Sequence, residues 1–166
     1  MSMSLEGLGA IWISIAEQRL CWTNHKGDQK DYMISTAKNG AGEMENSGCT
    51  PRGRHVIAQK IGADLPINSV LVGRVPTGEI YNETLAAQYP ARDWILSRIL
   101  WLSGIEAGHN QGAGCDSHAR YIYIHGTPDT EPMGVPCSHG CVRMRNADVI
   151  ELFDAVFEGT SVQIVE

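Results

Sequence analysis

The sequence predicts a single, mainly β domain with one helix near its C-terminus. The 166 residues include 18 glycines and 7 prolines, spread along the chain without a repeat or a low-complexity segment. Short apolar runs recur between them, and only one segment has a clear helical period. Such punctuation is typical of strands joined by turns. A chain of this length buries enough surface to fold without disulfides or a structural metal.

Runs rich in β-branched and aromatic residues predict the strands. They are residues 11–16, 20–23, 31–35, 56–61, 69–75, 94–102, 121–125 and 161–165. The run 94–102 is short enough to be a buried strand or a helix, and we favour a strand. Residues 85–89 predict a short helix or an irregular segment.

The C-terminal helix is predicted from Asn146, which is expected to act as its N-cap, over about residues 147–157. Its apolar stripe consists of Val149, Ile150, Phe153, Val156 and Phe157. Gly159 is expected to close it. Two Gly-rich loops, 38–51 and 104–117, are long for a compact domain, and either is expected to serve as a lid over a site.

Charge and composition exclude some classes of protein. Thirteen basic and nineteen acidic residues give a net charge of −6, which argues against a nucleic-acid binder. The first basic residue is Arg19, so residues 1–10 lack the basic region of a secretory signal. No apolar stretch reaches the ~18 residues of a membrane span. We therefore expect a cytoplasmic protein without a membrane partner.

The candidate catalytic residues lie between the last two predicted strands. His125 ends a strand and is followed by Gly126 and Thr127, and Ser138-His139-Gly140-Cys141 follows after a proline-containing loop. Thiol catalysis requires a base for the sulfhydryl proton, a group that orients the base, and donors for the oxyanion. A histidine at the end of a rigid strand supplies the base, and a glycine before the cysteine allows close backbone approach.

These residues resemble the signature of the L,D-transpeptidase (YkuD-type) family, in which a histidine precedes an [S/T]HGC block. The segments Ser35–Gly40 and Thr50–Gly53 and the first predicted hairpin resemble that family as well, so the similarity extends over residues 8–166. The resemblance implies one catalytic domain, built as a β-sandwich or partly closed barrel of mixed sheets with the C-terminal helix and short helical turns.

The resemblance also implies roles for individual residues. Cys141 is the nucleophile, and His125 is the general base, oriented by a carbonyl near Gly126. His139 and Gly140 shape the pocket and, with Cys141, the oxyanion hole. The remaining candidates for substrate binding are Arg143, which could hold a carboxylate through a bidentate fork, Ser138, which braces the loop, Gly126 and Tyr123. Tyr121 and Tyr123 either line the cleft or pack, and we favour packing.

Five cysteines leave two other interpretations open. Cys137 and Cys141 could form a redox pair, or they could bind a metal together with His139 and either His118 or Cys115. The spacing is CxxxC, and no second cysteine pair completes a tetrahedral set. We therefore predict no metal and no cofactor.

The resemblance implies action on peptidoglycan stem peptides. Because we expect a cytoplasmic protein, water is the abundant acceptor. We predict an L,D-carboxypeptidase that removes the terminal D-alanine from tetrapeptide muropeptides during cell-wall recycling, through an acyl-enzyme on Cys141. One alternative is an L,D-transpeptidase that forms 3–3 crosslinks. Another is a non-catalytic muropeptide-binding or redox-sensing protein. The sequence does not indicate an oligomeric state.

Overall fold

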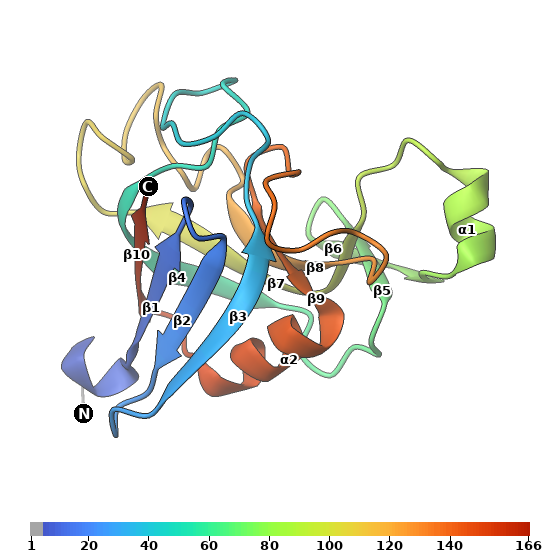
Figure 1. Cartoon of the computed structure of the whole chain (residues 1–166), viewed down its shortest axis with the longest axis horizontal. Coiled ribbons are helices and arrows are strands. Elements are labelled where there is room, and N and C mark those ends of the chain that lie inside the picture. Colours follow the sequence, from blue (N-terminus) through green and yellow to red (C-terminus); the bar gives the residue numbers. More distant parts are fainter. Residues whose placement is uncertain (1–4) are drawn as a thin grey trace.

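The strands of the computed structural model form one ten-stranded sheet that curves round and closes on itself (Figure 1). The structure describes residues 5–166. The strands are β1 (Ala10–Ser14), β2 (Arg19–Thr23), β3 (Gln29–Ser35), β4 (Gly53–Ile61), β5 (Ser69–Val72), β6 (Val75–Ile80), β7 (Ile95–Gly104), β8 (Tyr123–Thr127), β9 (Val142–Arg145) and β10 (Ser161–Val165). The helices are a 3₁₀ turn (Leu5–Leu8), α1 (Glu83–Gln88) and α2 (Asn146–Ala155).

The strand order is β4-β10-β1-β2-β3-β9-β8-β7-β5-β6, and β4 also pairs with β7. This extra pairing closes the first eight strands of the order into a barrel and leaves the β5–β6 hairpin outside it. Two pairs, β1–β10 and β8–β9, are parallel, and the other pairs are antiparallel. The mainly β, mixed-sheet barrel predicted from the resemblance is confirmed.

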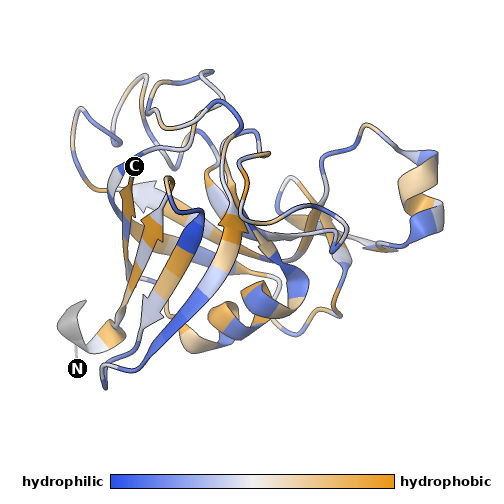
Figure 2. Cartoon of the chain, in the orientation of Figure 1, coloured by the Kyte–Doolittle hydropathy of each residue, from blue (hydrophilic) through white to orange (hydrophobic). Residues whose placement is uncertain are grey.

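The core lies between the barrel strands and α2. Alternate residues of each strand point inward, and Figure 2 shows the resulting alternation of hydrophobic and hydrophilic bands along β1 to β3. The cluster includes Ile13, Ile34, Leu100 and Ile124 from four different strands. Val149, Leu152 and Phe153 of α2 complete it. Burial of this apolar surface is the dominant force that holds the helix against the sheet.

The run 69–75 is not the single strand that the sequence predicted. Gly73 and Arg74 have positive φ angles of 55° and 67°, and the chain reverses there between β5 and β6. Two successive residues of positive φ produce the tight turn that matches the twist of a hairpin. The sequence did not predict this turn, because β-branched residues on both sides indicate a strand and because arginine seldom adopts a positive φ angle.

The prediction for 121–125 was wrong at both ends. Tyr121 has a positive φ of 58° and belongs to a turn, so β8 starts at Tyr123 and continues to Thr127. The strand β9 was not predicted, because Val142–Arg145 is short and contains two arginines.

Asn146 does not cap α2. It is the first residue of the helix, and its buried amide accepts a hydrogen bond from Ser97 Oγ (2.7 Å) and donates one to Thr127 O (2.8 Å). Asn146 therefore connects the helix to β7 and β8. The helix ends at Ala155, and Gly159, with a φ of 91°, lies in the turn that leads to β10.

Among residues 5–166, no helix has the length and hydrophobicity needed to cross a membrane. Residues 1–4 belong to the segment from which the absence of a secretory signal was predicted, and they lie outside the described part of the chain.

Candidate active site

The parallel pairing of β8 with β9 places His125 and Cys141 on one face of the sheet. Ile124 lies opposite Val142, and both side chains point into the barrel core. Their neighbours along each strand therefore point outward. Cys141 immediately precedes β9. It and His125 are therefore diagonal neighbours on the outer face, at a separation that a histidine side chain can span to approach the thiol.

The imidazole of His125 is held in one tautomer. Its Nδ1 lies 2.6 Å from the carbonyl oxygen of Gly126. Because a carbonyl only accepts, the proton is on Nδ1 and the lone pair is on Nε2. Burial lowers the pKa of His125, and the hydrogen bond to Gly126 and the charge of Asp93 oppose this only in part. Nε2 is thus ready to accept a proton at neutral pH.

The thiol of Cys141 is neutral in the resting state. The amide of Tyr123 donates a hydrogen bond to Sγ (3.3 Å), and the thiol donates one to the carbonyl of Tyr121 (3.3 Å). Burial raises the pKa of the Cys141 thiol to about 11, although the Tyr123 amide acts in the opposite direction. A thiol with this pKa needs a base to react at neutral pH.

The loop that precedes Cys141 is fixed from two sides. Ser138 Oγ donates to the carbonyl of Cys141 (2.5 Å) and accepts from the amide of Gly140 (3.2 Å), so it braces the loop. The hydroxyl of Thr50 donates to the carbonyl of Gly140 (2.9 Å). Gly140 has a φ of 137°, a conformation that favours glycine. The loop therefore has one defined shape.

Donors for an oxyanion are present in this loop. Within residues 5–166, the backbone amides of His139 and Cys141 donate no hydrogen bond. Backbone amides without a partner next to a nucleophile are the kind of donor that can stabilise the negative charge of a tetrahedral intermediate.

Gly126 supports the base instead of lining the cavity. A Cβ atom at this position would lie 2.4 Å from the carbonyl oxygen of Leu96 and 2.5 Å from Asn146 Oδ1. The backbones of β8 and β7 can approach each other here only because the side chain is absent.

Replacing Gly126 by alanine is expected to lower the free energy of unfolding by about 3 kcal/mol, because neither backbone nor buried amide can yield without strain. Urea unfolding measures the change. Gly27→Ala is the matched control, since its Cβ would meet no atom and only its positive φ of 86° opposes alanine. We expect a cost of about 1 kcal/mol there. Equal losses in the two variants would contradict the close approach at Gly126.

Arg143 and His139 share one partner, Asp93. Arg143 Nη2 donates to Asp93 Oδ1 (3.0 Å), and Nη1 donates to the carbonyl of Cys137 (3.4 Å). His139 Nδ1 lies 3.2 Å from Asp93 Oδ2. The guanidinium of Arg143 is nearly buried and is engaged by these protein groups, while the His139 side chain is 77% exposed. Sequence reasoning missed Asp93.

A cavity of about 400 Å³ reaches the thiol. Its walls come from three segments: residues 45–48, residues 119–122 and the loop 139–141. Tyr121 lines this cavity, whereas Tyr123 is buried and its hydroxyl accepts a hydrogen bond from Arg74 Nη1 (3.0 Å). Tyr121 thus lies at the cavity, where its ring also packs near Trp101, and Tyr123, a candidate for substrate binding, does not line this cavity.

Arg120 connects two walls of the cavity and was also missed from the sequence. Its guanidinium donates to the carbonyl oxygens of Cys49 (2.7 Å) and Glu43 (3.2 Å). Its positive charge favours the ionised form of Cys141. Arg120 therefore holds the loop 42–49 against the wall at 119–122 and brings a cation close to the nucleophile.

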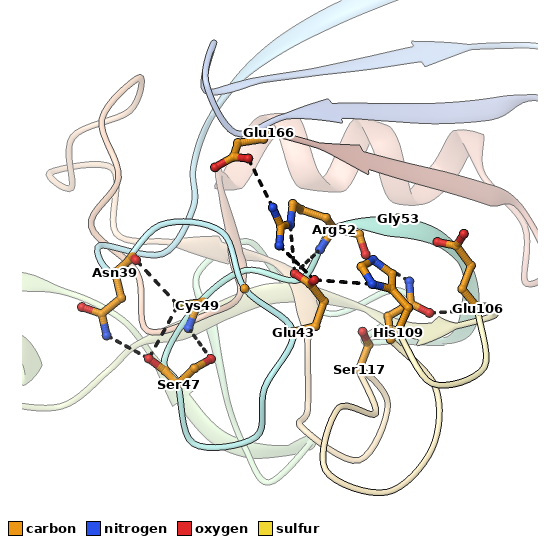
Figure 3. Close-up of polar contacts among 12 residues, drawn as sticks. Asn39, Glu43, Ser47, Cys49, Arg52, Gly53, Glu106, His109, Ser117 and Glu166 are labelled. Carbon is orange, nitrogen blue, oxygen red and sulfur yellow. Dashed lines mark hydrogen bonds and ion pairs between the residues drawn. The ribbon is translucent and has the colours of Figure 1, made fainter.

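Both Gly-rich loops are anchored behind the cavity. Figure 3 shows Glu43 between Arg52 and His109, with Arg52 also directed at Glu166. Burial of Glu43 opposes ionisation, but the hydrogen bonds from Arg52 keep the pKa of its carboxyl below the usual value. The side chain of His55 on β4 fixes the second loop through Ser117 Oγ (2.8 Å).

All five cysteines are free thiols. In the described part of the chain, no group of three or more histidine, cysteine or acidic residues is arranged to hold a metal ion.

Comparison with known proteins gives a consistent result. The model of the L,D-transpeptidase catalytic domain, YkuD, matches residues 9–164. The probable L,D-transpeptidase YbiS of Escherichia coli is 35% identical over 114 residues, which cover 64% of this chain and 35% of that protein. The probable L,D-transpeptidase ErfK/SrfK of Salmonella typhimurium is 47% identical over 47 residues, covering 28% of this chain and 15% of that protein.

A solved structure shows the same fold. L,D-transpeptidase 3 from Mycobacterium tuberculosis, in complex with a faropenem-derived adduct, matches 96% of this chain and 60% of its own, with a TM-score of 0.60 and 14% identity. The match to YbiS spans about a third of that relative's length. The chain belongs to the L,D-transpeptidase catalytic domain family, whose members are enzymes that act through a catalytic cysteine.

Proposed function

We propose that this protein is an L,D-carboxypeptidase that removes the terminal D-alanine from peptidoglycan tetrapeptides during cell-wall recycling in the cytoplasm. The observation that carries the proposal is the placement of a neutral thiol, Cys141, and a neutral imidazole, His125, on the same outer face of the β8–β9 pair. The cavity that reaches the thiol, about 400 Å³, has the size of a site for one small ligand. In this proposal the end of one stem peptide occupies the cavity, and water accepts the acyl group from Cys141.

The acylation step uses the groups described above. Nε2 of His125 takes the proton from Cys141 Sγ, and the sulfur forms a bond to the carbonyl carbon of the third stem residue. The amides of His139 and Cys141 hold the resulting oxyanion. The C–N bond then breaks, and His125 returns the proton to the amine of the departing D-alanine. A thioester remains on Cys141.

Deacylation reverses the roles. His125 takes a proton from a water molecule, whose oxygen attacks the thioester carbonyl. The tetrahedral intermediate collapses, the C–S bond breaks, and the proton returns to sulfur. The products are the tripeptide acid and the free enzyme, so one water is consumed for each D-alanine released.

The second candidate function is L,D-transpeptidation. A second cavity of about 400 Å³ adjoins the first and shares Glu45, Ala119 and Arg120 with it. An acceptor stem bound there would bring its amine toward the thioester in place of water. The carboxylate of Glu45, which lines both cavities, has the charge to attract such an amine.

Mass spectrometry of the products separates these functions. The enzyme is incubated with a disaccharide tetrapeptide alone, and then with an equal amount of a tripeptide as acceptor. We expect one D-alanine and one tripeptide for each tetrapeptide in both reactions. Crosslinked dimers in either reaction would favour the transpeptidase. The absence of D-alanine in both would refute the carboxypeptidase proposal.

A further inference from the structure

Asp93 contacts residues on both sides of the nucleophile although it is distant from them in the sequence. It lies in the segment between α1 and β7. Its two carboxylate oxygens are divided between His139, two residues before Cys141, and Arg143, two residues after it. One carboxylate therefore connects the two segments that flank the thiol.

The cation that Asp93 neutralises stands directly beside the catalytic base. Arg143 is the register partner of His125 in the β8–β9 pair, and both side chains are on the outer face. The guanidinium is nearly buried, and its other acidic neighbour, Glu131, is 4.0 Å away. A positive charge at this place makes protonation of His125 less favourable. The carboxylate of Asp93 offsets that effect.

The exposed side chain of His139 is oriented by the same carboxylate. Within residues 5–166, Asp93 is the one hydrogen-bonding partner of the His139 side chain. His139 lines the cavity next to Gly140 and Cys141. A largely exposed ring at the wall of the cavity would otherwise sample several rotamers.

We propose that Asp93 is a positioning residue of this active site: its carboxylate holds Arg143 and His139 in place and sets how readily His125 accepts the thiol proton. The proposal rests on the roles of Cys141 and His125 given above, but it does not depend on which acceptor the enzyme uses.

The charges that face His125 determine the direction of the effect. They are Arg143 on β9 and Asp93 from the segment before β7, with Glu131 next to Arg143, while the neutral thiol of Cys141 lies on the same face. Although burial opposes it, nearby His125 and the Arg143 guanidinium hold the pKa of the Asp93 carboxyl below its usual value, so the group is ionised at neutral pH. Loss of this negative charge would lower the pKa of His125 further and would lower the pKa of Cys141 as well.

The test measures the reactivity of Cys141 without any peptidoglycan substrate. Wild type, Asp93→Asn and Asp93→Glu are alkylated with short pulses of iodoacetamide between about pH 4 and pH 12, a range that includes the Cys141 pKa of about 11, and the modified Cys141 peptide is quantified by mass spectrometry. Glu79→Gln is the matched control. It removes the acidic partner of Arg92 (3.1 Å), the residue next to Asp93, and Glu79 is not part of the site.

In Asp93→Asn, we expect both limbs of the pH–rate profile to move to lower pH. The plateau rate should fall about tenfold, since a weaker base assists less. Asp93→Glu should restore the position of the limbs, and Glu79→Gln should match the wild type. A lower rate with unmoved limbs would reduce Asp93 to a structural role and overturn the proposal. D-alanine release is measured separately, so its absence would refute the proposed function without affecting this result.

Discussion

Replacing Cys141 by alanine is expected to reduce D-alanine release by about 10⁴–10⁶-fold. The thiol is the atom to which the acyl group is transferred, and no neighbouring group can take its place. Serine is a poor substitute, because its hydroxyl is far harder to deprotonate and His125 is a weak base after burial. Intact-mass measurement should show no acyl adduct on the variant.

The fold should survive this substitution. Within residues 5–166, the sulfur makes two hydrogen bonds, with the amide of Tyr123 and the carbonyl of Tyr121, and the residue packs at the edge of a small apolar cluster. Cys21→Ala is the matched control, since Cys21 lies on β2 and is a free thiol outside the site. It should retain full activity. If Cys141→Ala still bound tetrapeptide and wild type also released no D-alanine, the protein would be a muropeptide binder. D-alanine release by Cys141→Ala would eliminate Cys141 as the nucleophile.

Replacing His125 by glutamine is expected to lower kcat/KM at pH 7 by about 10²–10⁴-fold. Glutamine can occupy the space but cannot accept the thiol proton. The shape of the pH profile should change as well. Without the imidazole, the rate should rise steadily with pH toward the thiol pKa of about 11, because only spontaneous ionisation then supplies the thiolate.

The measurement is the pH dependence of kcat/KM for D-alanine release, with His25→Gln as the control. His25 lies in the exposed turn between β2 and β3, so its removal should leave the profile unchanged. A His125→Gln enzyme with the wild-type profile and only a reduced rate would show that another group is the base.

Most strands could be predicted from the sequence, because residue types that favour strands lie where the folded sheet buries one of its faces. In β1, Ile11 and Ile13 are buried and Trp12 between them is exposed, as expected for a strand with one face on the core. Some failures are local, such as the turn at Gly73 and Arg74, and others come from an interaction made far along the chain. Asparagine is a residue type that often caps helices. Asn146 instead lies in the core, where its amide is hydrogen-bonded to Ser97 and Thr127.

The same distinction holds for the site. His125 and Cys141 belong to a motif, and the resemblance of that motif to the L,D-transpeptidase family is what predicted that they act together. Asp93 and Arg120 belong to none. Asp93 meets Arg143 across 50 positions of the chain, and Arg120 meets Cys49 across 71, so no local period or spacing marks either residue. Only the closure of the barrel brings these charges to the thiol.

The position of β10 has a consequence for the order of synthesis. This strand lies between β1 and β4, and it pairs with both. Until residues 161–165 emerge from the ribosome, β1 and β4 each present an open row of amides and carbonyls, and the cylinder stays incomplete. Open strand edges readily pair with other chains. The nascent polypeptide, rather than the finished enzyme, is therefore the form most exposed to aggregation.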